Sequence, residues 1–255
     1  MVAEPRIELP YRVRFDECGP DGNLPSSGFL RYAQDLAWVH ADGAGFGRGW
    51  YGQRGLTWLI RAVELEILEN AAHGETVDAS TEVIGFRRVW ARRRSEFTRR
   101  DSERTLAVAA IDWVLLNAAG TPVRVPRDII AAFATPPSGT FTPLRIDVPP
   151  SPADAARREF AVRRSELDPM AHVNNAAYLD YIDELLVGAG GEGEVTRLPR
   201  RYRVEFLAPA GPGMLVRGYG WAIEPAWCYR LESAADGREL VRARVETDPR
   251  TWVGG

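Results

Sequence analysis

The residue types best suited to chemistry lie in one stretch, 160–187, which reads FAVRRSELDPMAHVNNAAYLDYIDELLV. It brings the carboxyl group of Asp168, the imidazole of His172 and the amide of Asn174 close together in sequence. A carboxylate can take a proton from water or attack an electrophilic carbon directly, and an imidazole can orient either reactant. The combination indicates a reaction centre.

The elements around these residues would hold them in place. The apolar and Arg positions of residues 160–164 predict a strand. Either Asn174 or Asn175 suits a helix N-cap, because its side-chain oxygen can accept from the free amides of the first turn. The helix is expected from there on, since apolar residues follow at helical spacing: Tyr178, Leu179, Ile182, Leu185 and Leu186. The loop then lies beside a helix N-terminus, whose partial positive charge favours a developing oxyanion.

The same pattern occurs near the start of the chain. Residues 11–36 align without a gap over residues 160–185, an offset of 149 positions. Matched pairs include Val13 with Val162, Arg14 with Arg163, Glu17 with Glu166, Pro20 with Pro169, Leu30 with Leu179, Tyr32 with Tyr181 and Leu36 with Leu185. The chemistry is not kept, because Asp168, His172 and Asn174 align with Gly19, Asn23 and Pro25. We therefore expect two tandem units, of which only the second is equipped for catalysis.

Composition narrows the function classes. At 255 residues the chain has room for two domains with cores of their own. A net charge of −3 implies no general attraction to nucleic acid, and the absence of Lys excludes a Lys nucleophile or Schiff base. His40, His73 and His172 lie far apart in sequence, and the two cysteines form no metal-binding spacing. We expect neither a metal site nor any cofactor.

The chain carries no sequence signal for a membrane or for export. Its first residues, MVAEPRIELPY, lack the apolar core of a signal peptide, and no run of 18 apolar residues occurs. Cys18 and Cys228 are expected to be reduced thiols. We therefore expect a soluble, cytoplasmic protein without a membrane span.

Strand signals follow one long helix in each half of the chain. They cover 56–68, 75–84, 89–98 and 105–116 in the first half, and 200–207, 214–223, 227–233 and 240–247 in the second. A short helix is expected at Arg127–Phe133. Six of the 18 prolines fall between Pro136 and Pro152, which predicts a semi-rigid linker. The pattern is α+β, with an N-terminal unit at 1–133, a linker at 134–158 and a C-terminal unit at 159–255, each an antiparallel sheet wrapped around one long central helix.

Three further features of the first unit bear on function. The glycine-rich segment 42–55 is expected to form a turn, because it lacks the order and helix context of a phosphate-binding loop. The run Arg92–Arg94 is expected to be a solvated strand face; alternatively, it receives an acidic carrier protein or the phosphates of CoA. Further arginines near this run are Arg87, Arg88, Arg99 and Arg100. The large apolar residues of the first unit that are expected in the core are Phe29, Trp38 and Trp58.

The arrangement resembles a double hotdog protein, and more closely the acyl-ACP thioesterases of bacteria and plants. The similarity covers nearly the whole chain, with LTWLIRAVELEI and AIDWVLLN followed by PVRVP in the first half and DPMAHVNNAAYLDY in the second. The last segment is also similar to single-hotdog acyl-CoA thioesterases of the 4-hydroxybenzoyl-CoA type. The resemblance implies a tandem hotdog fold, a monomer or homodimer, and hydrolysis of a fatty acyl-ACP or acyl-CoA thioester.

The resemblance also implies roles for individual residues. Asp168 would be the general base or nucleophile, and His172 would orient water, substrate or Asp168. Asn174 would fix the loop or bond the substrate, and the amides at the Asn174–Asn175 helix start would stabilise the oxyanion. The first unit would shelter the acyl chain. The candidate substrate-binding residues are Met170, Asn175, Trp38 and Trp58.

Two features depart from the plant-type pattern. Plant-type enzymes have Asn between the Asp and the His, where this chain has Met170, and a Glu-Cys pair in a later strand, near which this chain has Pro209 and Ala210. Met170 is normal for the acyl-CoA type. A mechanism centred on Asp168 is therefore expected, rather than one based on Cys or assisted by Asn.

Two other functions remain open. A hotdog enoyl-thioester hydratase or dehydratase also pairs Asp with His, but residues 166–172 read ELDPMAH and not the Asp-x-Asn-Pro-x-His form. A non-catalytic acyl-thioester binding protein is the other, because one unit already lacks the catalytic residues. Release of free acid, of a hydrated product or of neither distinguishes the three.

Overall fold

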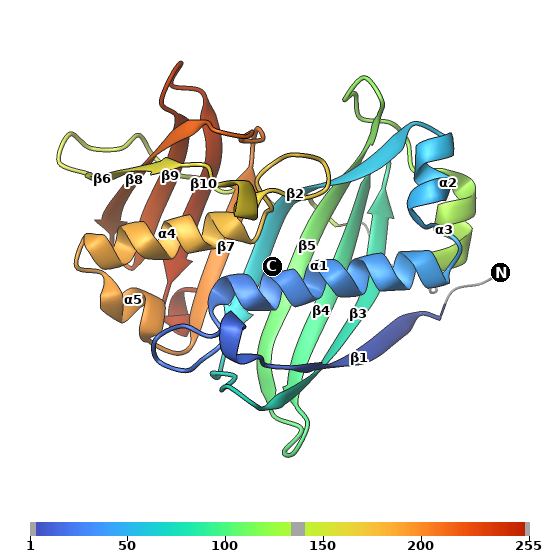
Figure 1. Cartoon of the computed structure of the whole chain (residues 1–255), viewed down its shortest axis with the longest axis horizontal. Coiled ribbons are helices and arrows are strands. Elements are labelled where there is room, and N and C mark those ends of the chain that lie inside the picture. The colour runs from blue at the N-terminus through green and yellow to red at the C-terminus, as the bar shows by residue number, and fades with distance from the viewer. Residues whose placement is uncertain (1–3, 134–140, 253–255) are drawn as a thin grey trace. The chain divides into compact units, whose positions relative to one another are not determined.

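The computed structural model describes residues 4–133 and 141–252 (Figure 1). The chain forms two compact units. The first comprises Met1–Val63 and Asn70–Leu144, and the second comprises Glu64–Glu69 and Arg145–Gly255. In each unit a long helix packs on antiparallel strands, which confirms the α+β class.

The first unit packs helix α1 (Ser26–Gly43) on β1, β3, β4 and β5 (Figure 1). Its strands are β1 (Arg6–Arg12), β2 (Leu56–Ile67), β3 (Thr76–Arg87), β4 (Trp90–Arg99) and β5 (Thr105–Asn117), in the order β1-β3-β4-β5-β2. The last residues of β2, from Glu64 on, belong to the second unit. Short helices α2 (Arg48–Gln53) and α3 (Arg127–Phe133) follow α1 and β5. The apolar face of α1 is fully buried at Phe29, Leu30, Ala33 and Leu36.

The second unit repeats the arrangement with helix α4 (Ala177–Gly188) packed on β6 and β8. Its strands are β6 (Ala156–Ala161), β7 (Arg200–Phe206), β8 (Leu215–Ile223), β9 (Ala226–Ser233) and β10 (Glu239–Glu246), in the order β7-β10-β9-β8-β6. The short helix α5 (Glu192–Thr196) follows α4. A 3₁₀ turn precedes each long helix, at η1 (Phe15–Glu17) and η2 (Arg164–Glu166), and η3 (Pro249–Thr251) follows β10.

The observed elements correct several expectations. A helix, α2, lies inside the glycine-rich segment 42–55 that was expected to be a turn, and α5 has no counterpart among the predicted elements. β6 begins at Ala156, inside the stretch 134–158 expected to be linker, of which 134–140 lie outside the described residues. The short helix Arg127–Phe133 has the predicted bounds.

The arginine run on β4 is not a solvated face throughout. Burial alternates along this strand, and Ala91, Arg93, Ser95 and Phe97 are its buried positions. A strand turns successive side chains to opposite faces, so three arginines in a row cannot all point outward. Arg93 is 8% exposed, whereas the side chain of Arg94 is 40% exposed.

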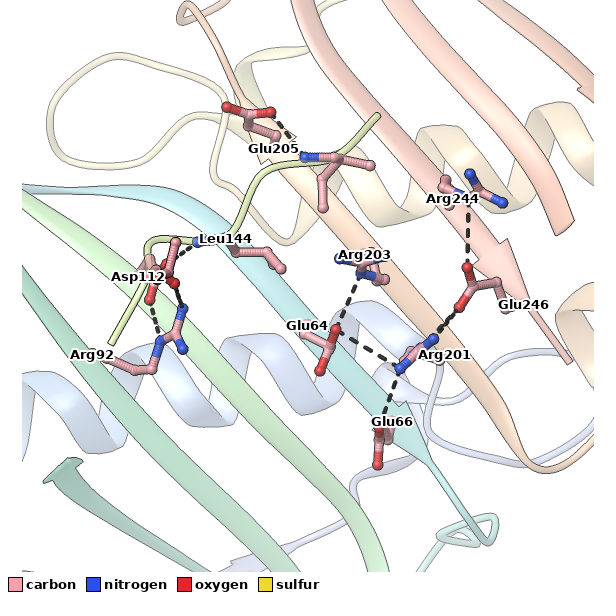
Figure 2. A network of polar contacts seen from close by, with 12 residues as sticks. Glu64, Glu66, Arg92, Asp112, Leu144, Arg201, Arg203, Glu205, Arg244 and Glu246 are labelled. Atoms are coloured by element: carbon pink, nitrogen blue, oxygen red, sulfur yellow. Dashed lines mark hydrogen bonds and ion pairs between the residues drawn. The ribbon is translucent and has the colours of Figure 1, made fainter. Parts of the chain in front are cut away.

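Buried carboxylates anchor the described part of the proline-rich linker (Figure 2). In the first unit, Asp112 accepts from the guanidinium of Arg92 at 2.6 and 2.9 Å and from the Leu144 amide at 2.7 Å. In the second, Glu205 accepts from Arg145 at 2.6 Å and from the Ile146 amide at 3.3 Å. Asp112 and Glu205 are at most 3% exposed, so these residues of the linker are held against each unit by buried acceptors.

An ion-pair network in the second unit joins the end of β2 to β7 and β10 (Figure 2). Arg201 on β7 donates to Glu246 on β10 at 2.5 and 2.9 Å, and both are 5% exposed. Arg201 also lies 4.0 Å from Glu64 and 3.9 Å from Glu66, and Arg203 lies 3.1 Å from Glu64. Burial, with the charge of Glu64, raises the pKa of Glu66. These contacts tie Glu64 and Glu66, near the end of β2, to strands of the second unit.

The approach of α4 to its sheet depends on glycine. A Cβ atom at Gly220 on β8 would overlap Cδ2 of Leu185, which is 2% exposed on α4. We expect Gly220→Ala to destabilise the protein by roughly 1–3 kcal/mol, because the well-packed leucine has to shift. Urea unfolding measures this. Gly193→Ala on α5 is the matched control, since nothing lies within 4 Å of a Cβ there. A Gly220→Ala protein as stable as the control would contradict the packing argument.

Candidate functional site

The candidate site is built on a tight loop between η2 and α4. The amide of Asp168 donates to the carbonyl of His172 at 2.8 Å, and the amide of Ala171 donates to the carbonyl of Asp168 at 2.9 Å. An isolated bridge pairs Leu167 with Val173 across the base of the loop. Ala171 has φ 59°, a conformation that glycine adopts far more easily. The loop is therefore a fixed turn.

The first unit contains the same loop without the same side chains. Gly19 donates to the carbonyl of Asn23 at 2.9 Å, and Gly22, with φ 75°, donates to the carbonyl of Gly19 at 3.0 Å. These bonds match those of Asp168, His172 and Ala171 at the offset of the repeat. The backbone of the loop is thus the same in both units, while a carboxylate at the position of Asp168 and an imidazole at the position of His172 occur only in the second.

The loop fixes the Asp168 carboxylate through one of its oxygens. Oδ1 accepts from the Met170 amide at 2.8 Å and from the His172 amide at 3.3 Å. Within the described parts of the chain, no group donates to Oδ2. Asp168 is half-buried, so one oxygen is held and the other is open to a reactant.

The imidazole of His172 lies in the same loop. Its backbone amide and carbonyl both bond to Asp168, which ties the two residues together. The half-buried ring hydrogen-bonds to none of the residues 4–133 and 141–252. It is thus available to a ligand. Met170, at the tip of the loop, is 46% exposed and is not packed in the core.

The start of α4 differs from the expected one. The helix begins at Ala177, and its N-cap position, Ala176, makes no side-chain cap. Asn174 forms a turn instead: its Oδ1 accepts from the Ala176 amide at 2.9 Å, and its own amide donates to the carbonyl of Glu166 at 2.8 Å. The Asn174 amide is therefore not available to an oxyanion, which corrects that part of the expectation. Asn174 fixes the loop.

The Asn175 amide is the donor left over at this helix start. Neither its backbone N–H nor its side chain bonds to any residue in the described ranges, and Asn175 is half-buried. An amide near a helix N-terminus with no internal acceptor suits an oxyanion. The structure thus keeps one of the two amides expected for that role.

Tyr178 contacts the rear of the loop and was not singled out by its sequence position. Its hydroxyl oxygen accepts from the Ala210 amide at 3.0 Å, and the carbonyl of Ala210 accepts from the Val173 amide. Burial, together with the nearby Asp168 carboxylate, raises the pKa of Tyr178 to about 12. Tyr178 therefore stays protonated at neutral pH and keeps a donor near Asp168. In the sequence Tyr178 fits the apolar face of the helix, so only its hydroxyl group could have indicated a role in the site.

Glu166 is the second residue that sequence reasoning passed over. It is buried, and its carboxylate accepts from the Tyr181 hydroxyl at 2.6 Å and from the Arg163 amide at 2.7 Å and guanidinium at 2.8 Å. Its carbonyl also holds the Asn174 amide. Burial acts to raise the pKa of Glu166, but the bonds from Tyr181 and Arg163 outweigh it and hold that pKa below its usual value.

The two tryptophans proposed to bind substrate lie in the first unit. Trp38 on α1 is 48% exposed, so the expectation that it lies in the core is wrong. Trp58 on β2 packs against a buried aromatic cluster and donates through Nε1 to the Tyr51 hydroxyl at 2.9 Å. Their role in binding stays a prediction.

Among the described residues, no group of three or more His, Cys, Asp or Glu side chains could hold a metal ion. None of the described helices is long and apolar enough to cross a membrane.

Solved structures share this fold over nearly the whole chain. An acyl-ACP thioesterase from Bacteroides thetaiotaomicron superposes with a TM-score of 0.80 at 18% identity, covering 95% of this chain and 97% of the other. The 12:0-ACP thioesterase from Umbellularia californica gives a TM-score of 0.79 at 18% identity, with 96% and 98% covered. The double hotdog architecture is confirmed.

Sequence comparisons agree with the structural ones. A chloroplastic acyl-[acyl-carrier-protein] hydrolase of Cuphea viscosissima is 24% identical over an alignment of 267 positions, which covers 94% of this chain. The chain spans 62% of the length of that relative. The family model described as the acyl-ACP thioesterase N-terminal domain matches residues 6–133, and that of the C-terminal domain matches residues 151–216. The chain belongs to the acyl-ACP thioesterase family.

Proposed function

We propose that the protein hydrolyses acyl-ACP thioesters at the Asp168 loop of the second unit. The observation that carries the proposal is the pairing of a fixed carboxylate that has one open oxygen with an unengaged amide, Asn175, at a helix start. The first of these features is missing at the matching position of the first unit, where Gly19 replaces Asp168. A structural role alone would explain neither the open oxygen nor the difference between the units.

The reaction follows from this geometry. Oδ2 of Asp168 takes a proton from water as the water oxygen bonds to the thioester carbon, and the carbonyl oxygen becomes an oxyanion beside the Asn175 N–H. When the tetrahedral adduct collapses, the C–S bond breaks and the thiolate leaves with its electron pair. Solvent then protonates the thiolate and takes up the proton from Asp168, which restores the carboxylate. His172 would orient the water or the thioester.

Direct attack by Asp168 is the other route open to the same residues. Oδ2 would bond to the thioester carbon and expel the thiolate, which leaves a mixed anhydride that water then hydrolyses. Trapping with hydroxylamine during turnover distinguishes the routes. An acylated or hydroxylamine-modified Asp168 indicates the anhydride, whereas the activated-water route leaves Asp168 unmodified throughout.

The carrier is proposed to be acyl carrier protein. Both matched family models are acyl-ACP thioesterase domains, and the named relatives act on acyl-ACP. Acyl-CoA remains an alternative, because Met170 fits the acyl-CoA type of loop.

A substrate panel tests the proposal. Saturated and 2-enoyl thioesters of ACP and of CoA, with C4 to C18 chains, are incubated with the protein, free thiol is followed, and products are identified by mass. We expect thiol release with free acid as the product, faster from ACP than from CoA. A product heavier by one water and still a thioester would identify a hydratase instead. Binding without any product would identify a binding protein.

A further inference from the structure

A buried arginine in the first unit has no carboxylate partner. Arg93 on β4 is 8% exposed, and one guanidinium nitrogen lies 3.0 Å from Nδ1 of His40 on α1. In the described part of the chain, no carboxylate pairs with Arg93, and its other two guanidinium nitrogens bond to nothing. Burying a guanidinium without a counter-charge costs free energy, so a buried Arg93 points to an anionic partner that is bound there.

His40 does not supply the missing charge. Its Nε2 lies 2.7 Å from the carbonyl oxygen of Glu4, so Nε2 carries the proton and donates, and Nδ1 accepts from Arg93. Burial, together with the charge of Arg93, lowers the pKa of His40, which is therefore neutral at pH 7. Burial also lowers the pKa of Arg93 to about 10, which still leaves it charged. The pair carries one net positive charge.

The nearby hydroxyl adds another donor. Tyr51 accepts from Trp58, so its own proton is free to be donated, and burial raises the pKa of Tyr51 and keeps that proton in place. The Arg93 charge acts on this hydroxyl. Asp128 also acts on Tyr51, but it is exposed and its Oδ1 accepts from the Ile129 amide. The Asp128 carboxylate is thus stabilised by the Ile129 amide and by solvent.

The surroundings of these donors are apolar. The guanidinium carbon of Arg93 lies 5.5 Å from the centre of the Phe133 ring, and the His40 ring meets the same ring edge-on at 5.0 Å. Phe133 and Tyr51 belong to a buried cluster with Phe46, Val83, Leu115, Val125, Ile129 and Ala132. A ligand for this place needs an acceptor-only anionic head and an apolar body. A carboxylate on an aliphatic chain has both, and a guanidinium binds it through two parallel bonds.

We propose that Arg93, with Tyr51, forms a site for the carboxylate of an aliphatic acid inside the first unit, with His40 positioning Arg93. Two sources share this chemistry. One is a free fatty acid, which is the product of the proposed reaction. The other is the distal carboxyl group of an ω-carboxyacyl thioester. Only the choice of these sources rests on the proposed function; the site itself does not.

Binding tests the site without any turnover. Titration calorimetry compares dodecanoate with dodecanol, which has the same chain and no charge, on the wild-type chain, Arg93→Met and Arg94→Met. Arg94 is the matched control, because its side chain is exposed on the same strand and pairs with Glu96. We expect Arg93→Met to weaken dodecanoate binding roughly ten- to a hundredfold, the range typical of charge-assisted hydrogen bonds, and to leave dodecanol unaffected. Equal binding of dodecanoate by wild type and Arg93→Met would overturn the proposal.

Stability distinguishes this site from a structural arginine. If Arg93 is held for a ligand, Arg93→Met without ligand should melt at or above the wild-type temperature, because an uncompensated buried charge is removed. A large fall in melting temperature, reversed by Arg93→Lys without recovery of dodecanoate binding, would assign Arg93 to the fold and overturn the proposal.

Hydrolysis assays then separate the two sources. If the distal carboxyl is bound, wild type prefers 11-carboxyundecanoyl-ACP to dodecanoyl-ACP, and Arg93→Met loses the preference. If the product is bound, wild type shows no such preference but is inhibited by dodecanoate more strongly than Arg93→Met. Carboxylate binding without hydrolysis of any thioester would retain the site and reject the proposed function.

Discussion

Replacing Asp168 with asparagine is expected to reduce thioester hydrolysis roughly 10²- to 10⁴-fold, the range typical of losing a general base. The Asn side chain can still accept from the Met170 and His172 amides, so the loop should keep its shape. What is lost is the open oxygen as a proton acceptor or nucleophile. The loss is measured as the rate of thiol release from the best acyl-ACP substrate of the panel at saturating concentration.

The repeat supplies the control for this variant. Asp21 lies in the matching loop of the first unit, where its Oδ1 accepts from the Asn23 amide at 3.0 Å. Asp21→Asn makes the same chemical change on the same kind of turn, and we expect it to leave the hydrolysis rate unchanged. Equal losses in both variants would point to loop stability and not to catalysis. Full activity in Asp168→Asn would remove Asp168 from the mechanism.

The tandem architecture could be predicted because the two units keep the same apolar faces at a constant offset. The match of Glu17 with Glu166 and of Tyr32 with Tyr181 is visible in the sequence, and in both units the Tyr hydroxyl donates to the Glu carboxylate, at 2.8 and 2.6 Å. Such a long-range pair cannot be recognised from spacing alone. Two copies of it at the same offset are the signal that could have revealed it.

The start of α4 was misplaced because two uses of Asn compete. An Asn before a helix can cap the first turn, or its side chain can close a turn on the backbone just ahead of the helix. Asn174 does the second, and its amide is taken by the carbonyl of Glu166, a contact made by folding and not by local sequence. The proposed oxyanion role therefore rests on the Asn175 amide alone.

The buried Arg93 was hidden for a different reason. A run of identical residues shows no period, so the alternation of β4 can be seen only from Ala91 and Phe97 at its sides. Helix α2 was missed because glycine lowers helix propensity, whereas Tyr51 gains burial in the aromatic cluster that forms only in the folded unit. In both cases tertiary packing decided what local preference left open.

Replacing Glu166 with glutamine is expected to lower the stability of the protein at pH 7 by about 2–3 kcal/mol, because charge-assisted bonds from Tyr181 and Arg163 to a buried acceptor are lost. Arg163 is 74% exposed in its side chain and regains water, which keeps the loss below that of a fully buried pair. Urea unfolding at pH 7 measures this difference.

The pH dependence of that difference has a definite sign. The folded state lowers the pKa of Glu166, so the ionised form is favoured by folding. Its contribution to stability is complete above the unfolded pKa of about 4.3 and is lost as the pH falls through the lower folded-state value. The gap between wild type and Glu166→Gln should therefore be constant near neutral pH and close in acid. A gap that widens in acid would contradict this assignment.

Glu17→Gln is the matched control in the first unit. Glu17 makes the same bond to Tyr32, but its side chain is 23% exposed, so we expect a smaller loss of stability and no loss of activity. In contrast, Glu166 also holds the Asn174 amide at the base of the candidate site. A displacement of about 1 Å there can cost on the order of a hundredfold in rate, so Glu166→Gln should slow hydrolysis while Glu17→Gln does not. Equal activity in the two variants would mean that the hydrogen bonds of Glu166 stabilise the fold but do not position the catalytic groups.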